Sequence, residues 1–130
     1  MTSPTDKTLP TPDAGSVQLV QSYGPGRFRI SGVEHVGPIL LAANLCDRWD
    51  VGSAADISAP SLARLRAIEP RIEILVVGCG ARATLLSPQQ REELRAAGWS
   101  PEVMDTGAAC RTYNVLLAEG RRVAAALLPL

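Results

Sequence analysis

The sequence predicts one α/β domain in three layers, with a central mixed, mostly parallel sheet, helices packed on it and an extra N-terminal antiparallel β layer. The chain has 130 residues, and single domains usually occupy about 100 to 150 residues, so one domain fits. Hydrophobic residues make up 46% of the chain, which is enough to bury a sizeable core. Short β-like segments fill the first third, and helix-like and strand-like segments alternate afterwards, as a parallel sheet with crossover helices requires.

The first sixteen residues predict a flexible tail, which leaves residues 17–130 as the domain. They include three prolines and six serines or threonines, and they offer little apolar surface that could offset the entropy lost on ordering. They lack both the apolar run of a signal peptide and the arginines of a mitochondrial transit peptide. No later segment reaches the roughly 20 apolar residues of a membrane span, so we expect a bacterial cytoplasmic protein without a transmembrane segment.

Four short segments between Val17 and Ala43 predict the antiparallel layer and its connection to the main sheet. Glycine and proline separate them, and alternation in the second segment places Phe28 and Ile30 toward the core. These expected strands cover residues 17–23, 27–30, 33–36 and 39–43, and a further short strand is expected at 48–51.

The second half predicts three helices that alternate with three strands. Ser87, Pro88 and Gln90 have the pattern of a capping box with proline at the first helical position, and Gly98 is placed to end that helix. Thr106 is expected to cap the last helix. The expected helices run from Ser58 or Ser61 to Ile68, from 88 to 97 and from 108 to 119, and the expected strands cover 72–77, 101–104 and 123–128.

The charge balance and the cysteine count exclude several classes of function. Thirteen basic residues face thirteen acidic ones, so the bulk attraction to phosphate that non-specific nucleic-acid binding needs is missing. Cys46, Cys79 and Cys110 are too scattered for a disulfide framework, and His35 alone cannot complete a zinc site with them. We therefore expect no nucleic-acid partner, no metal and no cofactor.

Gly78, Cys79 and Gly80 form the first candidate binding segment. They follow the strongest expected strand, where open α/β sheets place their ligand crevice. A complete dinucleotide-binding motif would need a third glycine where Ala83 stands, and the following helix begins too late for a tight phosphate cradle. A glycine-rich turn that lets the backbone pass closely is the alternative interpretation.

Asp105, Thr106 and Gly107 form the second candidate segment and match the Asp-Thr-Gly triplet of retropepsin-type aspartic proteases. Those enzymes pair two carboxylates in an all-β fold, whereas this triplet opens a helical segment, so protease activity is not expected. The structural interpretation is that Asp105 ends a strand, Thr106 caps the helix and Gly107 permits a tight turn.

Cys110, Arg111 and Asn114 lie in the first turns of the same expected helix. A helix N-terminus and an adjacent arginine both lower the pKa of a thiol, which would make Cys110 more reactive, and a Cys110–His35 pair would require folding to bring the two together. A small buried side chain is the alternative for Cys110. Arg111 and Asn114 are three residues apart and share a helix face, where they could bind a ligand or partner.

The stretch MDTGAACRTYNVL, from Met104, together with EGRRVAAAL, from Glu119, closely resembles a small domain family of unknown function. That family includes assembly factor three of the mitochondrial NADH:ubiquinone oxidoreductase (complex I). Further matches are residues 27–30, 37–41, 74–78 with Gly80, and Trp49, and the resemblance runs from about residue 17 to the end. It implies a central mixed sheet with helices against one side and an additional β layer.

The resemblance implies a non-enzymatic interaction protein that assists assembly of a respiratory complex. Its partners would be respiratory-complex subunits or assembly factors, which could hold it at the inner face of the membrane, and self-association is also left open. The alternative is a small-molecule-binding or thiol-dependent enzyme that uses the loop Gly78–Gly80 and the segment Asp105–Asn114.

Overall fold

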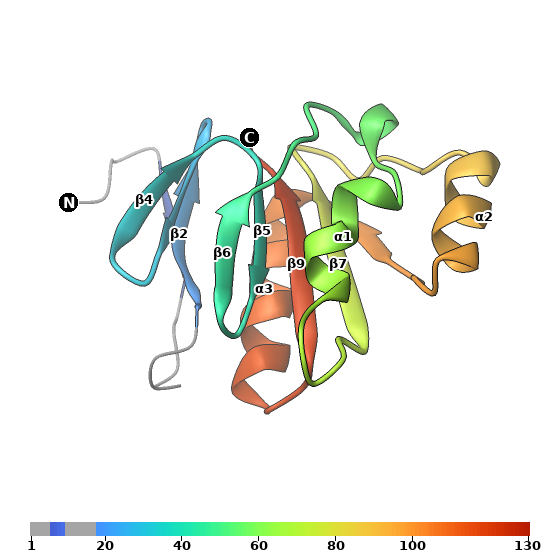
Figure 1. Cartoon of the computed structure of the whole chain (residues 1–130). Helices are drawn as coiled ribbons and strands as arrows, with labels where there is room; N and C mark the ends of the chain where they lie inside the picture. Colours follow the sequence, from blue (N-terminus) through green and yellow to red (C-terminus); the bar gives the residue numbers. More distant parts are fainter. Residues whose placement is uncertain (1–5, 10–17) are drawn as a thin grey trace.

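The computed structural model describes residues 6–9 and 18–130, which form two sheets (Figure 1). The smaller sheet is antiparallel, and its strands follow one another in chain order: β1 (Lys7–Thr8), β2 (Val20–Gly24), β3 (Arg27–Ile30) and β4 (Val33–Val36). The larger sheet contains β5 (Ile39–Ala42), β6 (Leu45–Arg48), β7 (Ile74–Cys79), β8 (Glu102–Met104) and β9 (Val123–Leu128), in the spatial order β6-β5-β9-β7-β8.

The larger sheet is mixed and lies at the centre of the molecule, which confirms the predicted α/β fold class. Strand β7 runs parallel to both β8 and β9, whereas β5 runs antiparallel to both β6 and β9. The change of direction therefore falls between β9 and β5, so the N-terminal part of this sheet is an antiparallel hairpin. The parallel part carries the crossover helices, because parallel neighbouring strands cannot be joined by a tight turn.

Helices cover both faces of the central sheet, whereas the family resemblance implied helices on one side. The helix α3 (Thr106–Ala118) packs on one face together with the smaller sheet. The short helix α1 (Ala63–Arg66), the helix α2 (Pro88–Ala96) and the 3-10 turns η1 (Ala54–Asp56) and η2 (Pro60–Leu62) lie on the other face. None of the helices in the described part of the chain has the length and apolar character to cross a membrane.

Small side chains at the middle of β9 let both outer layers approach the central sheet. All six residues of β9 are buried, and they alternate between the two cores. Ala125 contributes to the core beneath α3, whereas Ala124 and Ala126 contribute to the core beneath α1 and α2. The two apolar cores are therefore separated only by the sheet itself.

Local signals in the sequence locate several elements correctly. Ser87 Oγ accepts a hydrogen bond from the Gln90 amide at 3.0 Å, and the Gln90 side chain accepts one from the Ser87 amide at 2.9 Å, so the predicted capping box is confirmed. Gly98 follows α2 with a φ of 89°, which favours glycine. Phe28 and Ile30 are both buried, as their alternation predicts.

The strand predicted at 48–51 is wrong, because the strand in this region is β6 at Leu45–Arg48. The side chain of Trp49 is almost fully buried, and its indole Nε1 donates a hydrogen bond to the Ser61 carbonyl at 3.1 Å. The Trp49 amide still donates to the Pro38 carbonyl at 3.0 Å, while the indole packs in the core beneath α1. A buried tryptophan is compatible both with a strand and with an irregular segment over the core, so the sequence pattern alone could not tell which of the two is present.

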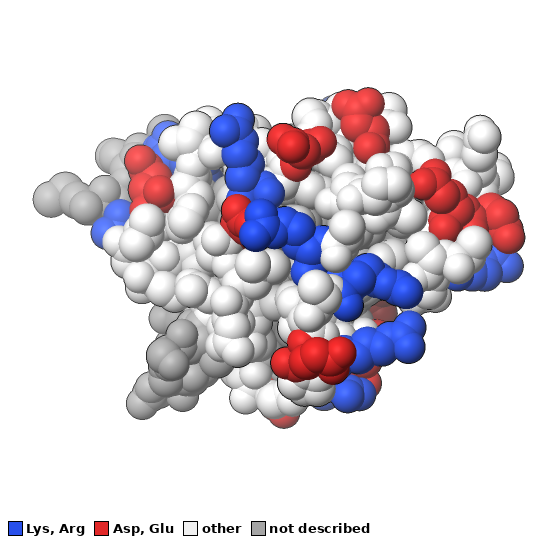
Figure 2. Space-filling model, in the orientation of Figure 1, with Lys and Arg blue, Asp and Glu red and all other residues white. Residues whose placement is uncertain are grey.

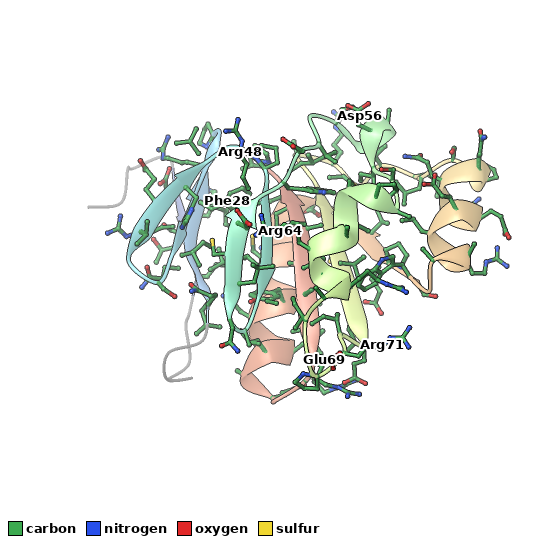
Figure 3. All side chains as sticks on the ribbon, viewed as in Figure 1. Phe28, Arg48, Asp56, Arg64, Glu69 and Arg71 are labelled. Carbon is green, nitrogen blue, oxygen red and sulfur yellow. The ribbon has the colours of Figure 1, made fainter. Side chains whose placement is uncertain are left out.

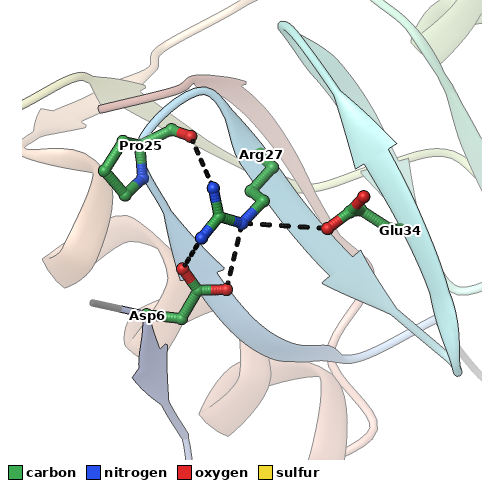
Figure 4. A network of polar contacts seen from close by, with 4 residues as sticks. All are labelled: Asp6, Pro25, Arg27 and Glu34. Atoms are coloured by element: carbon green, nitrogen blue, oxygen red, sulfur yellow. Dashed lines mark hydrogen bonds and ion pairs between the residues drawn. The ribbon is translucent and has the colours of Figure 1, made fainter. Parts of the chain in front are cut away.

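Most of the predicted tail, residues 1–5 and 10–16, lies outside the described residues, but residues 6–9 are described and differ from the prediction. Strand β1 pairs with β2, and Leu9 beyond it is buried. The Arg27 guanidinium binds the Asp6 carboxylate through Nη2 at 2.5 Å and Nε at 3.2 Å, with Glu34 at 3.7 Å (Figure 4). One apolar and one ionic contact thus attach a segment whose composition alone indicated a tail.

Candidate functional site

The side chain of Thr106 connects the ends of two central strands with the start of α3. Its hydroxyl accepts a hydrogen bond from the Gly80 amide at 2.8 Å and donates one to the Leu128 carbonyl at 2.5 Å. The Thr106 amide donates back to the Gly80 carbonyl at 2.8 Å, and the side chain is fully buried. We call Gly78, Gly80, Thr106 and Leu128 the strand junction, because they join the ends of β7 and β9 to the start of α3. The hydroxyl and amide of Thr106 are both hydrogen-bonded within the protein.

The glycines of the strand junction are required by close packing and by backbone conformation. Strand β7 continues through Gly78 and Cys79, so these two residues lie within the strand rather than in a loop after it. A Cβ on Gly78 would lie 2.9 Å from Thr106 Oγ1 and 3.0 Å from Leu127 Cδ2. Gly80 has a φ of 92°, a conformation that side chains disfavour. This segment is filled by protein atoms where a phosphate cradle would need open space.

Asp105, and not Thr106, caps α3. Its carboxylate Oδ1 accepts a hydrogen bond from the Ala108 amide at 2.9 Å, and its backbone is extended, as an N-cap residue requires. Both residue types can cap a helix, so the pattern alone did not separate them. Gly107 is buried within the first turn, and a Cβ there would lie 2.5 Å from the Tyr23 hydroxyl. Gly107 therefore allows α3 to approach β2 closely. The tight turn that the sequence predicted for this residue is not its role, because Gly107 already lies within the helix.

The predicted lowering of the Cys110 pKa is wrong. Cys110 is fully buried, and this burial raises the pKa of its thiol to about 12 despite the opposing charge of Arg111. Burial also raises the pKa of Cys79. The two thiols pack against different cores, on opposite faces of the central sheet, so the fold does not bring them together.

Arg111 and Asn114 lie in different environments, although their spacing places them on one side of the helix. Arg111 is exposed, whereas only 3% of Asn114 is accessible. Asn114 Oδ1 accepts a hydrogen bond from the Val20 amide at 2.9 Å, and Asn114 Nδ2 donates one to the Val20 carbonyl at 2.8 Å. The side-chain amide thus pairs with β2 as a neighbouring strand would. The hydroxyl of the preceding residue, Tyr113, donates to the Gln18 carbonyl at 2.7 Å.

His35 lies next to Cys46, not next to Cys110. The distance between Cys46 Sγ and His35 Nε2 is 3.4 Å, and both side chains are half-buried where β4 of the smaller sheet meets β6 of the larger one. Burial and the neighbouring Asp47 raise the pKa of Cys46 to about 11, so its thiol is protonated at neutral pH. Within residues 6–9 and 18–130, no group of three or more His, Cys, Asp or Glu side chains could hold a metal ion.

Among the surface grooves of the described residues, three are formed without any residue of the two predicted segments. The first has a volume of about 400 Å³ and lies between α2 and β8. The second, of about 210 Å³, lies between α1 and the end of α2, and the third, of about 250 Å³, lies beside Asn44 and Arg121. Trp99 borders both the first and the second groove.

Arginine side chains form a band across the face that carries α1 (Figure 2). Figure 3 places Arg48, Arg64 and Arg71 along this face. Arg64 pairs with Asp47, and Arg66 lies over the Trp99 ring, 5.7 Å from its centroid, while binding the Ala97 carbonyl. Several cations of the band are therefore held by neighbouring groups of the protein.

A family model described as a protein of unknown function (DUF498/DUF598) matches residues 20–128. The chain belongs to this family. The DUF498/DUF598 match covers both sheets except β1, and it therefore confirms the family resemblance inferred from the stretches after Met104 and Glu119.

Two kinds of relatives of this DUF498/DUF598 chain are similar in sequence. The NADH dehydrogenase [ubiquinone] 1 alpha subcomplex assembly factor 3 of Danio rerio is 42% identical over 117 residues, which are 90% of this chain and 67% of that protein. The Homo sapiens protein of that name is 40% identical over 90% of this chain and 64% of its own length. An uncharacterized Rhodobacter capsulatus protein is 42% identical over 85% of this chain and 84% of its own. The chain spans about two thirds of the assembly factors it matches.

Solved structures of DUF498/DUF598 relatives share the fold. A Bordetella parapertussis crystal structure superposes with a TM-score of 0.78 at 41% identity, over 90% of this chain and 99% of that one. A solution structure from Bordetella pertussis, described as a Mth938-like domain, gives a TM-score of 0.74 at 37% identity, over 95% of this chain and 92% of that one.

Sequence reasoning missed the residues around the first groove. Arg91 and Arg95 are four residues apart on α2, which is a sequence signal for a shared helix face, and Leu85 and Leu86 precede the capping box. These signals are weak separately, because the groove forms only where the fold places α2 and β8 on its two sides. The two predicted segments were chosen for their glycines and polar residues. In the structure these glycines allow close packing, and most of the polar side chains bind backbone groups of the protein.

Proposed function

We propose that this chain assists the assembly of a respiratory NADH dehydrogenase complex by binding its proteins, without catalysing a reaction. The observation that carries the proposal is the 40 to 42% identity over 117 residues with relatives named as assembly factors of that complex. Because this identity spans 90% of the chain, it is not confined to one motif.

The chemistry of the strand junction is consistent with a binding role. The hydroxyl of Thr106, the carboxylate of Asp105 and the amide of Asn114 all bind backbone groups of the protein, and each of these bonds has a structural role. A thiol-dependent reaction at Cys110 lacks support, because the thiol is buried and its pKa is about 12. Binding through the outer surface needs none of these groups.

The test is affinity purification of the tagged chain from its native host, combined with deletion of its gene. We expect co-purification of peripheral-arm subunits or assembly proteins of the NADH dehydrogenase, and a lower amount of assembled complex in the deletion strain. The control bait is an unrelated protein of similar size with the same tag. Repeated absence of such subunits, together with an intact complex after deletion, would overturn the proposal.

Partners of this kind would also determine where the chain acts. A peripheral-arm subunit would bring it to the inner face of the bacterial membrane. Fractionation of the same strains gives the measurement: the membrane-associated share of the chain should fall when its respiratory partners are deleted.

A further inference from the structure

The groove between α2 and β8, which we call the α2–β8 groove, is the largest of the three grooves described above. Its volume of about 400 Å³ is in the range of ligand-binding pockets, which is about 300 to 1,000 Å³. It is bordered by the segment before α2, by α2 itself and by the edge strand β8, which lies at the opposite side of the central sheet from β6 (Figure 1).

The walls of the α2–β8 groove are mainly apolar and partly uncovered. Leu86 and Trp99 are buried side chains that form its inner wall, and Val103 of β8 is half-buried in it. Leu85 at the rim is 83% exposed, the highest exposure among the large hydrophobic side chains of the described residues. Covering Leu85 with another apolar side chain would remove this surface from water.

The polar groups of the α2–β8 groove are positive or donate hydrogen bonds. Arg91 and Arg95 lie one turn apart, and no Asp or Glu is among the lining residues of the described chain. Arg95 contacts Glu92 at 3.0 Å in a pair that is mostly exposed, whereas Arg91 has no ion-pair partner in residues 6–9 and 18–130. A carboxylate would therefore complement this rim.

The indole of Trp99 adds a donor without an acceptor. Its Nε1 is buried and has no hydrogen-bond partner in the described structure, although only 6% of the residue is accessible. Buried indole N–H groups normally find an acceptor, and Trp49 in the same protein does so at the Ser61 carbonyl. Because Trp99 lines the groove, a carbonyl or carboxylate that displaced the atoms covering Nε1 would supply the missing acceptor.

Strand β8 offers backbone groups beside the same groove. It pairs with β7 on one side, and no other described strand pairs with its outer edge. An unpaired strand edge can hydrogen-bond to an extended segment of another chain. Val103 connects the two features, because it belongs to β8 and lines the groove.

We propose that the α2–β8 groove binds an extended acidic segment of a partner protein, which inserts one large apolar side chain against Leu85 and Trp99. Carboxylates on either side of that apolar residue contact Arg91 and Arg95. This inference deepens the proposed function and rests on it, because it assigns the surface that meets the assembly partners. Charge complementarity and the free strand edge favour an extended acidic segment over a second copy of this chain.

The experiment uses a random twelve-residue peptide library displayed on phage and panned against the purified full chain. The enriched peptides should combine an aromatic or large aliphatic residue with neighbouring Asp or Glu. A synthetic copy of the most enriched peptide should bind the double variant Arg91→Glu/Arg95→Glu at least about tenfold more weakly than the unaltered chain. The control variant Arg48→Glu carries the same kind of charge change at the opposite edge of the sheet and should bind unchanged.

Two further measurements separate direct recognition from loss of folding. A peptide whose acidic residues are replaced by Lys should recover binding to Arg91→Glu/Arg95→Glu. In nitrogen–proton correlation spectra, the peptide should shift the indole signal of Trp99 and leave that of Trp49 in place, because Trp49 already has its acceptor. The Trp49 signal also reports that each variant is folded.

The peptide experiments would overturn the inference if they gave no enrichment, enriched peptides without acidic residues, binding that is unchanged by the charge reversal, or an unshifted Trp99 signal. A dimer of this chain that the charge reversal dissociates would also overturn it, by showing that a second copy occupies the groove. Repeating the native-host purification with Arg91→Glu/Arg95→Glu separates the two proposals. Undiminished recovery of respiratory subunits would refute the groove alone, whereas peptide binding without such subunits would refute the assembly role alone.

Discussion

The strand junction and the α2–β8 groove lie in the same small domain but differ in how their polar groups are used. At the strand junction, Thr106 and its neighbours are bonded to backbone groups and no open space remains. At the α2–β8 groove, an indole donor and one guanidinium have no partner, and Leu85 faces water. Satisfied polar groups indicate a structural role, whereas unsatisfied groups beside exposed apolar surface indicate a binding role.

The largest expected effect is on the structural side, where Asn114→Ala leaves the amide and carbonyl of Val20 without partners. Both groups are buried, so the free energy of unfolding should fall by about 3 kcal/mol. Urea unfolding measures the change. The matched control is Asn44→Ala at an exposed position, which should shift the transition little. Equal effects of the two substitutions would show that the contact with β2 is not structural.

Gly107→Ala should lower the free energy of unfolding by about 2 kcal/mol, because its new Cβ would approach the Tyr23 hydroxyl to 2.5 Å. The double variant Gly107→Ala/Tyr23→Phe removes the clashing oxygen and should recover part of the loss. Thermal unfolding of the four chains in this cycle gives the coupling. Additive effects would contradict the close contact between α3 and β2.

The buried thiol of Cys110 predicts a pH dependence. Its pKa is raised from about 9 when unfolded to about 12 when folded, so the folded state holds the proton longer. The stabilising contribution is therefore complete below pH 9 and is lost as the pH rises toward 12, by up to about 1.4 kcal/mol per pH unit. Urea unfolding between pH 8 and 10.5 should show a steeper decline for the unaltered chain than for Cys110→Ala. Parallel curves would indicate an accessible thiol.

The smallest expected effect is on the groove side. Leu85→Ala should change the free energy of unfolding by less than about 0.5 kcal/mol, because the side chain is 83% exposed. Its neighbour provides the contrast, since Leu86→Ala empties a buried position and should cost about 3 kcal/mol. If Leu85→Ala destabilised the chain as strongly as Leu86→Ala, the α2–β8 groove would be part of the core rather than a surface.

Sequence reasoning succeeded where a structure depends on neighbouring residues and failed where it depends on distant ones. The capping box at Ser87 and Gln90 is local, and its prediction is confirmed. The bonds of Thr106 to Gly80 and Leu128, 26 and 22 residues away, have no signal in the residue types, so the hydroxyl was interpreted as a cap. The strand predicted at 48–51, which is β6 at Leu45–Arg48 in the structure, was placed incorrectly for a similar reason. Trp49 is buried against Ser61, which belongs to another element.

The α2–β8 groove could not be predicted from the sequence, because three separate segments of the chain form it. Leu85, Arg91 and Val103 carry no functional signal individually, and only the fold brings them to one surface. Its unsatisfied indole could not be foreseen either, since a tryptophan in a sequence gives no information about the acceptors around its nitrogen.

The position of β9 has a consequence for the order in which the molecule can be built. This strand lies between β5 and β7 but follows both in the chain, so each of them is synthesised before its shared neighbour exists. During translation the sheet is in two halves with open inner edges, and it closes only when Val123–Leu128 has left the ribosome. A ribosome stalled before this strand would therefore present two unpaired edges to chaperones and proteases.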